Sequence, residues 1–564
     1  MKKSLIAVMA LSLIGVSAIC GATRSNKNDV ARNLDIFNSL FKEMQTFYVD
    51  SIDTEKAVTT AIGAMLEELD PYTEYIPQKD QADFRSMTTG EYGGIGSYIM
   101  QRPAGGVYIS GPQEGSPAKE AGLKAGDLII MIDNDSVKGW NHSKVSEHLK
   151  GQAGTQVKVT VKRPYVTDSI LTFDITRRKI QMPSVPYSGV VDNGNLGYIN
   201  LSSFTDKSPE EVKEALTKLM KEDKIKGLIF DLRGNGGGVM ESAVKILGLF
   251  VPKGTEVIRT RGKGVLNEKI YRTTTNPIAP DLPIAVLVDG GTASAAEIVS
   301  GALQDLDRAV IVGNRSFGKG LVQTSRQLPY DGLLKVTMAK YYLPSGRLIQ
   351  AIDYSHRNED GSVGRIPDSL TTEFTTAHGR KVRDGGGIVP DITVEYPEIS
   401  RVTYNVVRDN WAFDYATKYA ATHPKMPDPA TFEISDSVYA DFKEFIDPDK
   451  FNYDKVCEVM LDRLKEVAKV EGYMNDSVTA QFTVLEGMLK RPLKRDLETH
   501  RQAIAPYLER EIVERYYGQP GSIRNQLRID PGMKEAEAVL DNPTRYRELL
   551  APKKESAETA VASK

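Results

Sequence analysis

Two polar residues beside glycines, Ser294 and Lys319, are the side chains whose surroundings most suggest chemistry. Ser294 ends the segment GGTAS after the apolar run PIAVLV, and Lys319 lies in SFGKG, 25 residues later (319 minus 294). A serine between a buried strand and a helix ordinarily caps the helix, and a lysine in a glycine turn is ordinarily solvated. The serine position would also expose a hydroxyl at the positive end of a helix dipole, where the Ala295 N–H could bind an oxyanion.

Two further glycine-rich features point away from nucleotides. In DLRGNGGG (231–238) the glycines follow an apolar strand, so their N–H groups could form a nest for an anion. A dinucleotide fingerprint would need glycine in place of Val239. The segment around Lys319 nearly matches a phosphate-binding loop, but Gly320 stands where a magnesium-binding serine or threonine belongs.

The elements that must position these residues follow from the hydrophobic pattern. Apolar residues at helical spacing from about 30 to 87 predict an all-helical leader, and strands alternating with helices from 189 to 394 predict an α/β core with mostly parallel strands. The predicted domains are a signal peptide (1–22), a helical N-terminal region (23–90), a β-rich module (91–180), the core (181–400), a helical C-terminal region (401–550) and a disordered tail (551–564).

The β-rich module resembles a PDZ domain through YGGIGSYI and SPAKEAGLKAGDLIIMIDNDSV. Gly94 and Gly96 would let backbone N–H groups converge on the terminal carboxylate of a peptide, while the next strand offers its edge for β-augmentation. A tight glycine hairpin without ligand is the alternative. The apolar peptide pocket is expected to comprise Ile95, Ile99, Val145 and Leu149.

Ordered blocks over roughly residues 60 to 395 carry a second resemblance. The blocks LGYINLSSF, DLRGNGGG, GGTASAAE, SFGKGLVQ, YYLPSGRLIQ and GGGIVPDI, together with the PDZ-like module, resemble the C-terminal processing proteases, also called tail-specific proteases. Gly236 is a departure, because many relatives have proline there. The resemblance implies a crotonase/ClpP-like α/β core with an inserted PDZ domain.

The resemblance also implies roles for three side chains: Ser294 as nucleophile, Lys319 as general base and Gln323 as the residue that orients the lysine. Only a neutral amine can accept a proton, so burial would have to lower the lysine pKa from about 10.4 toward roughly 7 to 8. In a helix or a strand, four-residue spacing places Gln323 on the face of Lys319, where an amide adds no charge. The six histidines show no recognisable triad setting such as G-x-S-x-G.

The oxyanion would be stabilised by the backbone N–H of Ala295 and by that of Gly237 or Gly238, and the choice between the two glycines stays open. No H-E-x-x-H motif occurs, so neither a metal nor a cofactor is expected. The implied partners are protein substrates with apolar C-terminal tails.

Composition and the first residues bear on location. A net charge of -3, from 72 basic and 75 acidic residues, gives no footprint for nucleic acid. Lys2 and Lys3 before an apolar run that ends at Ile19 predict export to the periplasm or cell envelope. Cys20 keeps a lipid-anchored form open as an alternative. The only other cysteine, Cys457, excludes an internal disulfide in the mature chain and is expected to be a buried thiol.

The sequence thus predicts an exported serine endopeptidase that cleaves proteins near their carboxyl ends. Two alternatives remain at this point: a catalytically silent PDZ scaffold of the cell envelope, and an amidase or esterase that uses the same residues on small molecules. Helical flanks at both ends are compatible with a homo-oligomer and equally with a role that only caps the core, while the sequence names neither the substrate nor an adaptor.

Overall fold

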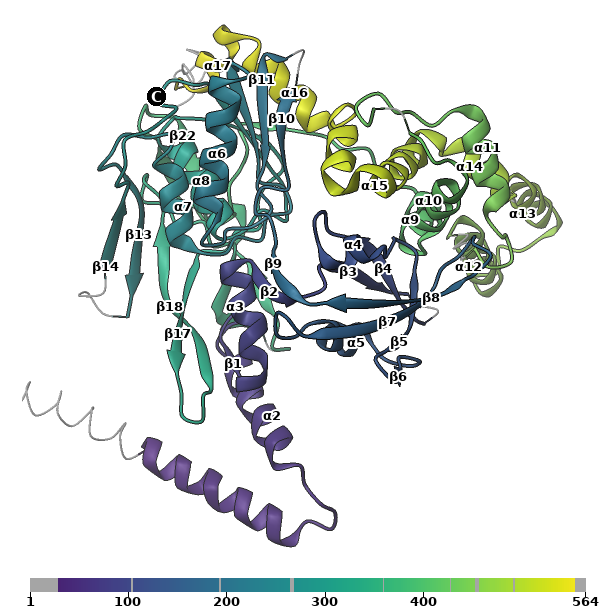
Figure 1. Cartoon of the computed structure of the whole chain (residues 1–564). Coiled ribbons are helices and arrows are strands. Elements are labelled where there is room, and N and C mark those ends of the chain that lie inside the picture. The colour runs from purple at the N-terminus through teal and green to yellow at the C-terminus, as the bar shows by residue number, and fades with distance from the viewer. Residues whose placement is uncertain are drawn as a thin grey trace, which may run out of the picture. The chain divides into compact units, whose positions relative to one another are not determined.

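The computed structural model of the chain (Figure 1) describes residues 29–102, 105–191, 194–263, 268–358, 360–426, 428–451, 456–489 and 492–552. The expected signal peptide and nearly all of the expected tail lie outside these residues. The chain divides into two compact units, one formed by residues up to 76 with 325–336, the other by 77–324 with 337–564. Among the described residues, no helix combines the length and apolar character needed to cross a bilayer.

The first unit contains a short strand that the sequence did not predict. A helix over residues 29–47 and α2 (Thr54–Glu67) are followed by β1 (Glu74–Ile76), which pairs antiparallel with residues 333–335. Lys335 Nζ lies 2.7 Å from Glu74 Oε1 across this pair. The expectation of an all-helical leader is therefore wrong at this point, because the hydrogen-bonding partner comes from far along the chain.

A six-stranded sheet forms the centre of the second unit. Its order is β10-β11-β12-β15-β16-β23, with β10 antiparallel and the others parallel. The strands are β10 (Tyr187–Val191), β11 (Leu196–Asn200), β12 (Gly227–Asp231), β15 (Ile284–Val288), β16 (Val310–Gly313) and β23 (Ile392–Thr393). The inner strands are buried, which explains their uninterrupted apolar runs. The predicted α/β core is confirmed.

Helices cover both faces of this sheet (Figure 1). Phe230 and Val286 point to the side of α6 (Ser208–Lys221), α7 (Met240–Leu247) and α8 (Ala295–Asp305). Ile229 and Leu287, the sequence neighbours of Phe230 and Val286, point to the side of α16 (Pro531–Leu540) and α17 (Pro543–Leu549). Alternate side chains of a strand point to opposite faces, so each strand contributes to two cores.

Beside this sheet, β13 (Glu256–Gly262) pairs antiparallel with β14 (Glu268–Arg272) and with residues 339–342 of β18 (Leu333–Tyr342), while β17 (Leu321–Gln327) also pairs with β18. Short pairs are formed by β19 (Ile352–Arg357) with β20 (Val363–Arg365) and by β21 (Glu373–Thr375) with β22 (Lys381–Arg383). The helix α3 (Gln81–Thr89) leads from the start of the second unit into the β-rich module.

The β-rich module is a sheet with the order β3-β4-β5-β7-β8, to which β6 (Asp135–Ser136) adds beside β5. Its strands are β3 (Ser97–Gln101), β4 (Val107–Pro112), β5 (Leu128–Ile132), β7 (Gln156–Lys162) and β8 (Ile170–Thr176), with helices α4 (Pro117–Ala121) and α5 (His142–Leu149). β2 (Glu91–Gly94) pairs with β9 (Arg178–Gln181), so the chain enters and leaves the module side by side. β3 lies at an edge of the sheet, as predicted.

The C-terminal helices contribute to two separate cores. The first contains α9 (Arg401–Arg408), α10 (Trp411–Thr422), α11 (Asp436–Phe445), α14 (Leu493–Thr499) and the first part of α15 (Arg501–Leu527), which kinks at Gly518. α12 (Val456–Val470) and α13 (Asp476–Leu489) form a hairpin. Cys457 of α12 is exposed, contrary to expectation, because it lies on a helix with little buried surface. The helices α16 and α17 instead pack on the central sheet.

Candidate active site

Ser294 is the residue from which α8 begins, as the sequence predicted. It has φ 56° and ψ -118°, a combination that is rare for a residue with a side chain. In α/β hydrolases, a strained turn between a strand and a helix exposes the nucleophilic serine. Every residue of α8 is buried, whereas Ser294 is half-buried. The hydroxyl-bearing residue therefore stands at the accessible N-terminus of a buried helix, next to the Ala295 N–H.

The glycines of the segment 231–238 pack directly against this turn. A Cβ atom at Gly237 would lie 2.7 Å from the Ser294 Cβ and 2.9 Å from the Ala295 nitrogen, so only glycine fits there. The Gly237 N–H donates to Asn235 Oδ1 at 2.8 Å and the residue is buried. Gly238 is exposed to solvent. The geometry thus favours Gly238 as the glycine whose N–H could face a reacting carbonyl.

Asp289 ties the glycine segment to the serine segment. Its Oδ1 accepts hydrogen bonds from the N–H groups of Gly234 (2.9 Å), Gly291 (2.9 Å) and Thr292 (3.0 Å). The Thr292 hydroxyl in turn donates to the Leu232 carbonyl at 2.9 Å. These contacts fix the two loops that follow β12 and β15 against each other.

Lys319 lies in the loop between β16 and β17 and is half-buried. Gln323 lies within β17, and its Nε2 donates to Thr337 Oγ1 of β18 at 3.0 Å. Lys319 precedes the strand, so the expectation of a shared helix or strand face does not apply to this pair. The role of Gln323 in orienting the lysine remains a prediction.

Glu297 is a buried acid that the sequence analysis missed. One carboxylate oxygen, Oε2, accepts from the N–H groups of Ser294 and Lys319, both at 2.9 Å. The other, Oε1, accepts from the Gly318 N–H (2.6 Å) and from the Ser316 hydroxyl (2.5 Å). Burial is the largest influence on this carboxyl and raises its pKa to about 7, against the opposing effect of these hydrogen bonds. The segment SAAE has the spacing of a capping box, which is the signal that could have identified Glu297.

The residues expected to bind a peptide lie together in the β-rich module. Ile95, Val145 and Leu149 are buried in its core, and Ile99 packs against that core from the edge strand β3. Gly96 has φ 74°, a left-handed conformation that suits glycine. Among the described residues, no group of three or more acidic, histidine or cysteine side chains is arranged to hold a metal ion.

Comparison with known proteins identifies three parts of the chain. Residues 195–356 match the model of peptidase family S41, residues 108–163 match the PDZ domain, and residues 402–540 match the model described as "Probable PDZ-protease, C-terminal helical domain". The predicted PDZ module is thereby confirmed. The match over 402–540 assigns a domain to the C-terminal helices, which lay outside the resemblance described for residues 60 to 395.

Two relatives in sequence agree with this assignment. A carboxy-terminal-processing protease of Bartonella bacilliformis is 36% identical over 334 residues, which are 58% of this chain and 75% of the relative. A "Probable CtpA-like serine protease" of Staphylococcus aureus is 30% identical over 465 residues, 82% of each chain. The solved structure of a photosystem II D1 C-terminal processing protease is 29% identical over 63% of this chain and 86% of that one, with a TM-score of 0.35. The chain therefore belongs to the C-terminal processing PDZ protease family, with a core of peptidase family S41.

Proposed function

We propose that this protein is an exported serine endopeptidase that cleaves proteins near their carboxyl ends with Ser294 as nucleophile and Lys319 as general base. The observation that carries the proposal is the carboxylate of Glu297, which receives the backbone N–H groups of both residues on one oxygen. The backbone N–H groups of two residues that lie on either side of α8 and β16 in the sequence thus bind the same oxygen atom, Glu297 Oε2. Family membership supports the same reading.

The proposed chemistry has two stages. The neutral Lys319 amine takes the Ser294 hydroxyl proton while the oxygen attacks the scissile carbonyl, and the resulting oxyanion is bound by the N–H groups of Ala295 and Gly238. When the tetrahedral intermediate collapses, the lysine gives its proton to the departing amine and an acyl-enzyme remains. Water then attacks the ester with the lysine again as base, which releases the new carboxyl end and restores the serine.

The PDZ module is proposed to capture the substrate tail. β3 is an edge strand, so its free N–H and C=O groups can pair with an extended peptide, while the turn from Gly94, the last residue of β2, to Gly96 can receive the terminal carboxylate. Capture near the carboxyl end would restrict cleavage to that part of the substrate. We further propose that the apolar run after Lys2 and Lys3 directs the chain to the cell envelope.

The test compares Ser294→Ala and Lys319→Ala with the wild type on an exported protein that carries a disordered apolar tail. Ser300→Ala is the matched control, because this hydroxyl lies in the same helix and donates only within it, to Ala296 and Glu297 carbonyls. Mass spectrometry of the substrate should show tail loss with the wild type and the control but not with the first two variants. Undiminished cleavage by Ser294→Ala would refute the proposal.

A serine-reactive fluorophosphonate separates the enzyme from a silent scaffold. The wild type is expected to be labelled at Ser294, and Ser294→Ala is not. A wild type that binds the tail peptide but neither cleaves it nor reacts with the probe would favour the scaffold. Turnover of small esters without turnover of peptides would favour the amidase or esterase alternative.

A further inference from the structure

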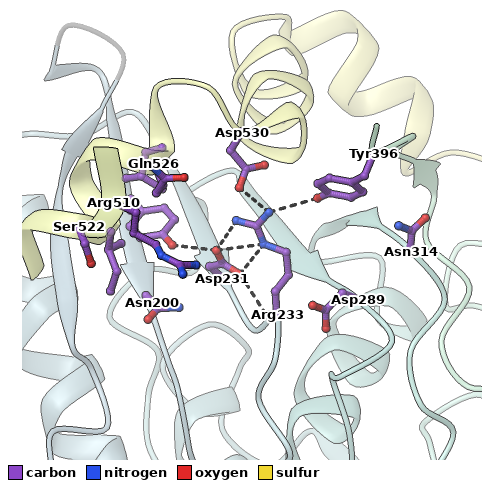
Figure 2. A pocket seen from close by; sticks show the side chains of 13 residues that line it. Asn200, Asp231, Arg233, Asp289, Asn314, Tyr396, Arg510, Ser522, Gln526 and Asp530 are labelled. Atoms are coloured by element: carbon purple, nitrogen blue, oxygen red, sulfur yellow. Dashed lines mark hydrogen bonds and ion pairs between the residues drawn. The ribbon is translucent and has the colours of Figure 1, made fainter. Parts of the chain in front are cut away.

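A pocket of about 500 Å³ lies at the base of the catalytic loops (Figure 2). The ends of four core strands line one side of it, and α15 and the start of α16 line the other. The strand-end residues are Asn200, Asp231, Asp289 and Asn314. Neither Ser294 nor Lys319 lines the pocket, so it is separate from the place where a peptide bond would be cut.

The side chain of Arg233 extends into this pocket and is ion-paired on two sides (Figure 2). Its Nη2 lies 2.6 Å from Asp231 Oδ2, and its Nη1 lies 2.6 Å from Asp530 Oδ2. Nη1 also donates to the Tyr396 hydroxyl at 3.2 Å, and the Tyr198 hydroxyl donates to Asp231 at 2.7 Å. The side chains of Arg233, Asp231 and Asp530 are only 17%, 4% and 18% exposed, so the two ion pairs lie in a poorly hydrated environment, where such pairs are strong.

Asp530 has two separate tasks at this position. Its Oδ1 caps α16 by accepting from the N–H groups of Gly532 (2.7 Å) and Met533 (3.2 Å). Its Oδ2 pairs with Arg233. Met533 is completely buried against the central sheet, so the capped end of α16 is a fixed point.

Arg233 connects this fixed point to the catalytic loop. The residue lies in the loop 232–238, four positions before Gly237, which packs against Ser294. Gly234, the next residue, is held by Asp289 from the opposite side. The first turn of the loop is therefore held by Asp231 and Asp289 from the core strands and by Asp530 from the start of α16, and its glycines follow directly.

We propose that Asp530 is a positioning residue for this reaction: through Arg233 it holds the loop 232–238 in the conformation that presents an oxyanion-binding N–H beside Ser294. The inference rests on the function proposed above. It makes the C-terminal helical region part of the catalytic apparatus, because that region supplies the Asp530 carboxylate that holds the loop from outside the core sheet.

Two substitutions at one position separate the tasks of Asp530. Asp530→Asn keeps a good helix cap but loses the charge that pairs with Arg233, whereas Asp530→Glu keeps the charge but caps poorly. We expect Asp530→Asn to lower kcat about tenfold or more, because small misplacements of catalytic groups are costly, and to leave KM for a tailed substrate nearly unchanged. Asp530→Glu should lower the melting temperature, while its effect on kcat should be smaller than that of Asp530→Asn.

A matched control and a coupled variant complete the experiment. Glu535→Gln removes another ion pair of α16, with Arg545 at 3.2 Å on the surface, and should leave kcat unchanged. Arg233→Lys keeps the positive charge but loses the planar guanidinium group that pairs with Asp231 and Asp530 through different nitrogen atoms. It is expected to lower kcat as Asp530→Asn does. In the double variant the two losses should not add, since both disrupt the pair of Arg233 with Asp530. Arg233→Lys also provides the answer if Asp530→Asn does not fold.

The outcomes distinguish this inference from the proposed function. If the wild type cleaves through Ser294 while Asp530→Asn and Arg233→Lys keep kcat within about twofold, the inference is refuted and the function stands. Strictly additive losses in the double variant would also refute it. A wild type without cleavage dependent on Ser294 would refute the function and, with it, the inference.

Discussion

Replacing Glu297 by glutamine tests whether one carboxylate holds the loops of Ser294 and Lys319 together. The change hardly alters volume, but an amide keeps one accepting oxygen and turns the other into an NH2 donor. In the native chain each carboxylate oxygen receives two donors: Ser294 and Lys319 on one, Gly318 and Ser316 on the other. Whichever way the amide is turned, its NH2 group faces two donors.

The expected magnitude follows from these contacts. A buried donor without an acceptor costs about 1–3 kcal/mol, so two of them would cost about 2–6 kcal/mol if nothing moved. The loop that carries Lys319 can relieve this cost by moving away from α8, which would separate the lysine from Ser294. A displacement of about 1 Å can lower a rate about a hundredfold. We therefore expect a kcat at least about a hundredfold lower and an unfolding free energy about 2 kcal/mol lower.

The assay measures both quantities on the same preparations. Urea unfolding gives the free energy, and mass spectrometry of a tailed substrate gives kcat. Glu241→Gln is the matched control, because Glu241 is an exposed acid in the first turn of the neighbouring helix α7. This control should behave as the wild type. If Glu297→Gln also kept wild-type stability and kcat, the bridging role of the carboxylate would be refuted.

Three further expectations concern pH and the PDZ module. Burial raises the pKa of Glu297 from 4.5 to about 7. The stability that its proton confers is therefore fully present below pH 4.5 and is lost as the pH rises through about 7. Unfolding free energies measured at several pH values should show this decrease in the wild type and not in Glu297→Gln. Gln323→Glu should raise the pKa of Lys319 and move the pH profile of kcat/KM to higher pH. An unmoved profile would contradict the prediction that Gln323 lies beside the Lys319 amine. A Cβ at Gly96 would lie 2.5 Å from the Ser116 Cβ, so Gly96→Ala should raise KM for tailed substrates while kcat stays nearly constant in steady-state kinetics; an unchanged KM would argue against tail capture by this loop.

Local patterns in the sequence were sufficient to predict the position of Ser294. A buried apolar run must end in a turn, and the small residues after it must begin a helix, so the start of α8 could be placed from a few neighbouring residues. The same reasoning predicted the alternating strands and helices of the core. Each of these features depends on periodicity and turn chemistry within one short segment.

Features that depend on distant partners could not be predicted in this way. The strand β1 exists because residues 333–335 pair with it, and nothing near Glu74 indicates that partner. Glu297 could be recognised as a capping residue from its spacing, but its second task appears only when the loop with Lys319 folds over α8. The pairing of Arg233 with Asp530 likewise joins segments that share no local pattern.

A buried acid, Glu297, and a half-buried one, Asp289, explain how three separate loops can form one site. The loops that carry Gly237, Ser294 and Lys319 follow three neighbouring parallel strands, and such strand ends meet at one edge of a sheet. Nearness alone does not fix loops that are rich in glycine, because glycine loses the most conformational freedom on folding. Asp289 and Glu297 each restrict this freedom by accepting hydrogen bonds from backbone N–H groups of two loops. Since Glu297 holds both proposed reacting residues whereas Asp289 holds only the glycine and serine loops, losing Glu297 should impair cleavage more than losing Asp289.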